Sequence, residues 1–107
     1  MAVTPIQIIS PQQAPNVKTT KYTAGASSRV RVDYMAFTND GVANVQFSVW
    51  IGPAGASQRI KDKTILPGEC YLCPEVIGAL LYPGDEVSIV SSAAGVLYVQ
   101  ANGVEFT

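Results

Sequence analysis

The sequence contains no histidine among its 107 residues, and only 14% of its residues are charged. Histidine is the usual proton shuttle at neutral pH and the commonest metal ligand. Its absence excludes serine–histidine and cysteine–histidine catalytic sites and histidine-bound metal centres. Seven basic and eight acidic residues give a formal net charge of -1. A chain so nearly neutral has no overall field that draws in nucleic acid, so we expect no direct nucleic-acid partner.

Cysteine is also scarce, with Cys70 and Cys73 as the two examples. A thioredoxin-type Cys-x-x-Cys motif opens a helix after a strand, whereas this pair follows a Pro-Gly turn in an extended stretch. On a strand, positions three apart point to opposite faces. A zinc site would need two further ligands of the same kind. The pattern predicts two reduced, structural thiols, with no metal and no cofactor.

The chain lacks a long unbroken apolar run. Two windows without charge, residues 41–58 and 87–104, are interrupted by glycine and polar residues and alternate with a period of two. Such windows are typical of strands and not of membrane helices, so we expect no membrane partner. No nucleophile has a base, and the chain shows no phosphate-binding glycine loop or cofactor motif, so we expect no enzyme activity.

The sequence predicts an all-β fold, because short alternating segments recur between turn signals. In residues 29–38, Val30, Val32 and Tyr34 alternate with Arg29 and Arg31. We expect one two-sheet antiparallel β-sandwich of jelly-roll type with about eight short strands. The expected strands are residues 3–9, 17–24, 29–38, 44–51, 58–66, 69–72, 86–91, 96–101 and 104–106, with a short helical turn at 75–80 and a turn at 102–103.

Three turns have specific sequence signals. Asn39, Asp40 and Gly41 predict a tight hairpin that pairs residues 29–38 with 44–51. Two Pro-Gly-acid triplets, residues 67–69 and 83–85, predict a pair of similar type II corners, because proline presets φ and glycine supplies the positive φ.

The first 16 residues form a candidate N-terminal arm, and residues 17–107 form the predicted sandwich domain. The arm carries no charge, and its Ile6, Ile8 and Ile9 stand among prolines that hinder a helix. An extended apolar segment suits strand addition to a neighbouring subunit or docking on a larger lattice. An ordered first strand of the same sandwich and a mobile tail are the alternatives.

Large apolar residues indicate an interface where they fall on the face of a strand opposite to the one that is expected to point into the core. Phe37 and Trp50 occupy such positions, and with Ile6, Ile8 and Ile9 they are the candidate interface residues. Trp50 covered by a loop of its own chain is the alternative. Tyr34 and Tyr98 are expected to point into the core, and the acidic residues at turns are expected to accept backbone hydrogen bonds.

The order of several motifs resembles small accessory structural proteins of tailed bacteriophage virions. The similarity covers about residues 20–107 and rests on six stretches: Tyr22-Thr23-Ala24-Gly25-Ala26, Arg29-Val30-Arg31-Val32, Thr38-Asn39, Ile65-Leu66-Pro67-Gly68-Glu69, Leu81-Tyr82-Pro83-Gly84-Asp85-Glu86-Val87 and Val104-Glu105-Phe106. Proteins of this kind are jelly-roll decoration (cement) proteins of the capsid, or accessories of the neck, tail or fibre. The resemblance transfers no catalytic residue.

The resemblance implies a capsid decoration protein that bridges major capsid subunits. Its expected location is the virion, assembled in the host cytoplasm, and its expected partners are further copies of itself, as a trimer, and the major capsid protein. A neck, collar or tail accessory is the second hypothesis. A carbohydrate-binding module that stacks sugars on Trp50 is the third.

Overall fold

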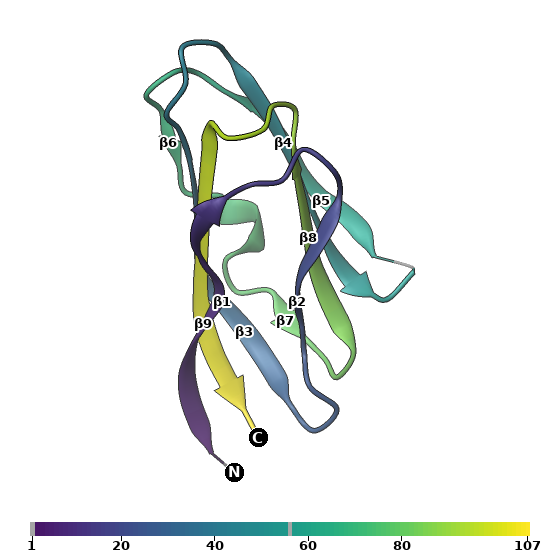
Figure 1. Cartoon of the computed structure of the whole chain (residues 1–107). Coiled ribbons are helices and arrows are strands. Elements are labelled where there is room, and N and C mark those ends of the chain that lie inside the picture. The colour runs from purple at the N-terminus through teal and green to yellow at the C-terminus, as the bar shows by residue number, and fades with distance from the viewer. Residues whose placement is uncertain (1, 56) are drawn as a thin grey trace.

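The computed structural model describes residues 2–55 and 57–107 and shows two antiparallel sheets packed face to face (Figure 1). The elements are β1 (Val3–Gln13), β2 (Thr19–Thr23), β3 (Arg29–Asn39), β4 (Val45–Pro53), β5 (Gln58–Ile65), β6 (Cys70–Tyr71), the 3₁₀ helix η1 (Pro74–Val76), β7 (Leu80–Leu81), β8 (Asp85–Ser91) and β9 (Leu97–Phe106). Sheet A has the order β1-β9-β3-β6, with β7 also paired to β3, and sheet B has the order β2-β8-β4-β5. Within the described residues, no helix is long and apolar enough to cross a membrane.

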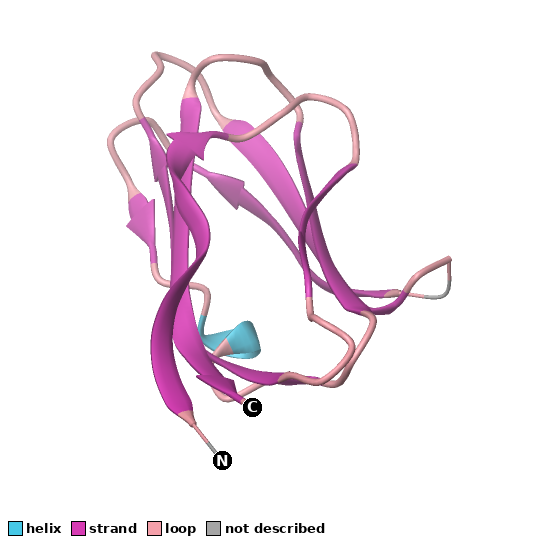
Figure 2. Cartoon of the chain, turned by 60° about the horizontal axis from the view of Figure 1, so that its bottom comes forward, coloured by secondary structure: helices cyan, strands magenta, loops and turns pink. Residues whose placement is uncertain are grey.

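The pairing of the strands is that of a jelly roll. Strands β6 and β7 both lie along the β3 edge that β9 leaves unpaired, so they are two halves of one interrupted strand. With that strand counted once, the first strand pairs with the last, the second with the next to last, and so on inward. A long hairpin rolled into two sheets has this pairing, which confirms the predicted fold class. The short helix η1 contacts β3 and β5 and closes one side between the sheets (Figure 2).

The structure corrects the predicted N-terminal arm, because β1 belongs to sheet A. It pairs with β9 along its length, and Ala2 and Thr107 exchange both backbone hydrogen bonds, at 2.8 and 3.0 Å. Along an antiparallel ladder, hydrogen-bonded pairs alternate with pairs that are not hydrogen-bonded. Ala2 is in a hydrogen-bonded pair, so Pro5, three residues later, is in a pair whose backbone nitrogens point away from the partner strand. Proline there removes a donor from the outer edge, and Pro11 lies in a β-bulge. Both features protect an edge strand against strand addition.

The predicted hairpin at residues 39–41 is wrong, because β3 lies in sheet A and β4 lies in sheet B. The tight hairpin turns need a positive φ, and neither Asp40 nor Gly41 has one. Instead, the buried Asn39 side chain donates to the carbonyls of Ala43 and Ile65, at 2.8 and 3.0 Å, and accepts a hydrogen bond from the Gly41 nitrogen. The Asn39 side chain therefore fixes the segment in which the chain passes from sheet A to sheet B.

The two Pro-Gly-acid corners are confirmed. Gly68 and Gly84 have φ values of 77° and 87°. In each corner the acidic side chain accepts a hydrogen bond from the backbone nitrogen three residues earlier, at 2.9 Å for Glu69 and 3.0 Å for Asp85. The local sequence is sufficient to specify these turns.

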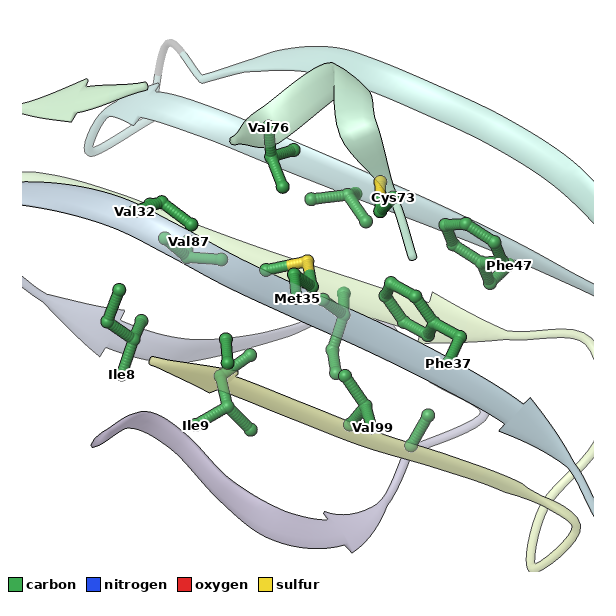
Figure 3. Packing of buried hydrophobic residues seen from close by; sticks show 14 of the residues in the cluster. Ile8, Ile9, Val32, Met35, Phe37, Phe47, Cys73, Val76, Val87 and Val99 are labelled. Carbon is green, nitrogen blue, oxygen red and sulfur yellow. The ribbon is translucent and has the colours of Figure 1, made fainter. Parts of the chain in front are cut away.

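The core lies between the sheets and is almost entirely aliphatic and aromatic (Figure 3). Phe37 of sheet A stacks on Phe47 of sheet B, with ring centroids 3.9 Å apart. Ile8 and Ile9 are both buried, although they are consecutive residues of one strand. Two neighbours on a strand reach the same side only where the alternation is interrupted.

Two β-bulges interrupt the alternation at the same level of sheet A. The β1–β9 register shifts between Gln7 and Ile9, and the β3–β9 register shifts between Val32 and Tyr34. Each bulge adds one residue to its strand and reverses the side-chain phase beyond it. On β3 the side chains that face inward are therefore Val30, Val32, Met35 and Phe37, all buried. The prediction that Tyr34 and Tyr98 point into the core is wrong, because both lie on the outer face.

Gly103 of β9 lies where the two bulges meet. A Cβ atom at this position would overlap the carbonyl oxygen of Arg31 and would lie 2.8 Å from Cδ1 of Ile8. The strands on both sides of β9 therefore approach its backbone too closely for any side chain. The sequence-based expectation of a turn at Asn102 and Gly103 is wrong, because both residues lie within β9.

We expect Gly103→Ala to lower the free energy of unfolding by about 2 kcal/mol or more, because the added methyl overpacks the backbone of β3. Urea denaturation followed by circular dichroism measures this change. The matched control is Gly25→Ala, whose Cβ would meet ordinary contacts, with the nearest atom at 3.4 Å. Equal midpoints for the two variants would contradict the packing argument.

Candidate interaction surfaces

The predicted interface residues of the N-terminal segment and β3 lie inside the fold. Ile8, Ile9 and Phe37 are buried in the core, and Ile6 packs against it. A side chain with almost no accessible surface has nothing to offer a partner, so the expected interface role of Ile8, Ile9 and Phe37 is wrong for this fold, whereas Ile6 keeps part of its surface exposed. Their burial follows from the bulges, which turn Phe37 and the isoleucine pair toward sheet B.

Trp50 lies on the outer face of sheet B and is half-buried. The ammonium group of Lys18 lies 4.5 Å from the centroid of its ring. Trp50 pairs with Ser88 on one side and with Arg59 on the other, and Ser48 follows on the same face. The neighbours of Trp50 on this face are therefore polar, and Lys18 partly covers the Trp50 ring.

The outer face of sheet A carries a contiguous set of apolar side chains near both chain termini. Residues that pair directly across a ladder share a face. One row is Val3, Phe106 and Arg29, and the next is Pro5, Val104, Arg31 and Leu80. The Arg29 guanidinium lies 5.4 Å from the Tyr82 ring, which extends the first row. We call these eight residues the terminal patch.

The terminal patch exposes large apolar groups, and both of its arginines contact aromatic rings. Val3, Leu80 and Tyr82 are 61%, 50% and 51% exposed. The Arg31 side chain forms an ion pair with Asp33 at 2.7 Å and lies 5.9 Å from the Phe106 ring. Arginine that is stacked on rings and paired with a carboxylate is typical of protein interfaces. The patch is therefore suited to contact with protein.

A groove occupies the other half of the same face, beyond the bulges. It has a volume of about 170 Å³ and lies over β9, with contributions from β1, β3 and β6. Its lining residues are Pro11, Gln12, Tyr34, Ala36, Thr38, Cys70, Tyr98, Val99 and Gln100. None of them is charged. We call this site the tyrosine groove.

A third cluster of polar side chains lies on η1 and the strands beside it. The Tyr71 hydroxyl donates to the Glu75 carboxylate at 2.7 Å, and the Cys73 thiol lies 3.7 Å from the same carboxylate. Lys61 approaches Glu75 at 3.5 Å, and the Lys63 ammonium lies 4.8 Å from the Tyr71 ring. These contacts tie η1 to β5 and β6, so the cluster closes the side of the sandwich.

The electrostatics of this cluster keep its thiol protonated. Burial, and then the charge of Glu75, raise the pKa of Cys73 from 9.0 to about 12. Burial and the hydrogen bond to Glu75 also raise the pKa of Tyr71, and that same bond lowers the pKa of Glu75. Cys70, by contrast, is exposed on β6, and both cysteines are unpaired. A neutral buried thiol is a poor nucleophile and metal ligand, which fits a structural role for Cys73.

The sequence-based predictions include neither the terminal patch nor the tyrosine groove. The residue pattern indicates part of the terminal patch but not the groove. Leu80 and Tyr82 flank the buried Leu81, an alternation that a strand assignment at residues 80–82 would have revealed. Tyr34 and Tyr98 carried no such signal, because their outward direction depends on a bulge. Within the described residues, no three histidine, cysteine or acidic side chains are grouped to hold a metal ion.

Comparisons with known proteins show the fold. No protein-family model matches the chain, and no curated protein sequence matches it. In structure, it is similar to a chain of the infectious bursal disease virus Gx strain, with a TM-score of 0.60, 15% identity and coverage of 97% of this chain and 32% of that one. A chain of the T13 particle of the same virus gives a TM-score of 0.58, 12% identity and coverage of 97% and 30%.

A third similar structure is a protein of Bacillus endospore appendages, described as a novel family of disulfide-linked pili. Its TM-score is 0.59 at 10% identity, and the match covers 98% of this chain and 88% of that one. This chain spans about a third of the length of each of the two viral chains. At these identities the likeness establishes a shared jelly-roll architecture.

The raised pKa values predict a loss of stability in alkali. Above pH 9.0 the unfolded chain releases the Cys73 proton, and above pH 10.0 the Tyr71 proton, while the folded chain keeps both. The stability that these groups contribute below pH 9.0 is therefore lost as the pH rises toward their folded pKa values. We expect the unfolding free energy to fall with pH in this range.

Chemical denaturation at a series of alkaline pH values measures the slope. The double variant Tyr71→Phe with Cys73→Ala removes both titrating groups, so we expect a shallower dependence on pH than in the unmodified chain. An unchanged slope would show that these two groups do not hold their protons in the folded state.

Proposed function

We propose that the chain is a bacteriophage virion structural protein, and specifically a capsid decoration (cement) protein that bridges major capsid subunits. The observation that carries the proposal is the terminal patch, which exposes large apolar side chains on the outer face of sheet A in a small protein. A solitary soluble domain of this size rarely leaves several large apolar side chains together in water. A partner that covers the patch gains from the burial of this area.

The fold supports a role in assembly. The neighbours that share the jelly roll at TM-scores of 0.58 to 0.60 come from virus particles and from pili, which are assemblies of many subunits. The resemblance to accessory proteins of tailed phages supports the virion and adds the expected partners: further copies of this chain, arranged as trimers, and the major capsid protein. We accordingly propose the virion, assembled in the host cytoplasm, as its location and no enzyme activity.

The chemistry of the terminal patch favours a protein partner over a nucleic acid. Its basic side chains are Arg29 and Arg31, and each is already engaged, with Tyr82 and with Asp33 and Phe106. A nucleic-acid-binding surface needs free basic groups that displace the counterions bound to the phosphates. Burial of the patch would add apolar contacts around two pre-positioned guanidinium groups, as in the centre of a protein interface.

We expect Leu80→Asp to weaken self-association at least tenfold, about 1.4 kcal/mol, because a buried carboxylate without a partner is costly. Size-exclusion chromatography with light scattering over a range of concentrations measures the dissociation. Leu66→Asp is the matched control, since Leu66 is 56% exposed, against 50% for Leu80, and lies outside the patch. An unmodified chain that stays monomeric and also fails to bind empty phage heads would overturn the proposal.

A neck, collar or tail accessory protein is the second form of the same proposal, and copy number separates the two. We expect quantitative gel analysis of purified virions to give hundreds of copies, as a shell protein requires. Tens of copies or fewer would assign the chain to the neck or tail instead.

A further inference from the structure

The tyrosine groove has a definite structural origin. Ala36 follows Tyr34 by two residues along β3, and its short side chain leaves a hollow between larger neighbours. The second bulge of β1, between Ile9 and Gln12, displaces Pro11 and builds one wall. Val99 and Ala36 are nearly buried and form the floor. The hollow is thus a consequence of the sheet geometry.

We propose that the tyrosine groove binds a single neutral sugar ring, such as one hexopyranose unit of a glycan. Tyr34 and Tyr98 line the groove, and a phenol ring can pack against the C–H groups of a sugar. The side-chain amide of Gln100 and the hydroxyl of Thr38 offer hydrogen bonds to its hydroxyl groups. Apolar walls with a few polar groups are typical of small-molecule sites.

The groove is partly pre-organised for a ligand. The Tyr98 hydroxyl accepts a hydrogen bond from Gln13 at 3.2 Å, and Gln12 accepts one from Lys21 at 2.8 Å. Among the residues described by the structure, the side chains of Tyr34, Thr38 and Gln100 make no hydrogen bond to protein, so their polar groups remain available. Side chains fixed before binding reduce the entropy that binding costs.

Size, charge and topology favour a sugar ring over other ligands. About 170 Å³ is less than drug-sized ligands occupy, which matches one ring. The uncharged lining gives nothing to balance a phosphate or a charged peptide. The groove lies over β9, whose two edges are both paired, so a peptide cannot add there as a strand.

This inference moves the candidate sugar site from Trp50 to sheet A and goes beyond the structural role. The groove and the terminal patch occupy different halves of one face, separated by the bulges at residues 7–9 and 32–34. A copy or capsid subunit seated on the terminal patch can therefore leave the groove open. The two proposals can fail separately, because one is read by sugar binding and the other by oligomeric state.

The first test is titration of the full chain with glucose, galactose and mannose, followed by NMR chemical shifts, with a glycan array alongside. We expect saturable shifts of groove residues with at least one hexose, in the millimolar range that suits one small ring. Absence of saturable binding to all three sugars, together with a blank array, would overturn the proposal.

Variants locate the binding. Tyr98 is 40% exposed, so Tyr98→Ala removes a wall without touching the core, and we expect at least a tenfold loss of affinity. Ala36→Leu fills the floor and is expected to abolish binding. Tyr82→Ala, at an exposed tyrosine of the terminal patch, and Trp50→Ala are matched controls that retain binding. Affinity lost in Trp50→Ala but kept in Tyr98→Ala would overturn the assignment to this groove.

A second measurement needs no variant. Cys70 lies in the groove lining and is exposed, whereas Cys73 is buried, so a thiol reagent labels Cys70 selectively. We expect a saturating hexose that binds in the groove to slow alkylation of Cys70, with the oligomeric state unchanged. Equal labelling rates with and without a sugar that binds would show that the sugar lies elsewhere.

Discussion

The paired bulges beside Gly103 are the constraint on which both surfaces of sheet A depend. They add one residue to each neighbour of β9 at the same level, and a glycine is needed there because β1 and β3 close on its backbone. On β3, the residues before the bulge place Arg29 and Arg31 on the outer face. After the bulge the inward and outward positions are exchanged, so that Phe37 enters the core and Tyr34 faces outward. One irregularity therefore divides the face into a terminal patch and a tyrosine groove.

The sequence contains enough information for the fold class and for local turns, but not for which strands meet. The alternation of Val30 and Val32 identifies a strand, and the two Pro-Gly-acid corners are specified by their own residues. The pairing of β3 depends on residues about seventy positions away, so a strong turn signal at Asn39 does not show which strand pairs with β3. Ile8 and Ile9 are predicted as interface residues of an extended arm, because the bulge that buries both of them leaves no pattern in the sequence.

The candidate surfaces differ in how much of them the sequence could reveal. Trp50 is correctly outward, yet Lys18 covers part of its ring and its cross-strand neighbours are Ser88 and Arg59, so the more apolar surface lies on the other sheet. Tyr82 and Leu80 are recognisable once residues 80–82 are assigned to a strand. The groove arises from a small residue, Ala36, beside a displaced strand, and such a hollow appears only in three dimensions. The low charge of the chain is the sequence feature that agrees with both surfaces.

The central claim is that partner subunits cover the outer face of sheet A at its terminal patch. Hydroxyl-radical footprinting with mass spectrometry compares the reactivity of each side chain in dilute protein and in the assembled particle. The account predicts that Leu80, Tyr82 and Phe106 become protected on assembly while Trp50 keeps its reactivity. Protection of Trp50 with an unchanged terminal patch would contradict it.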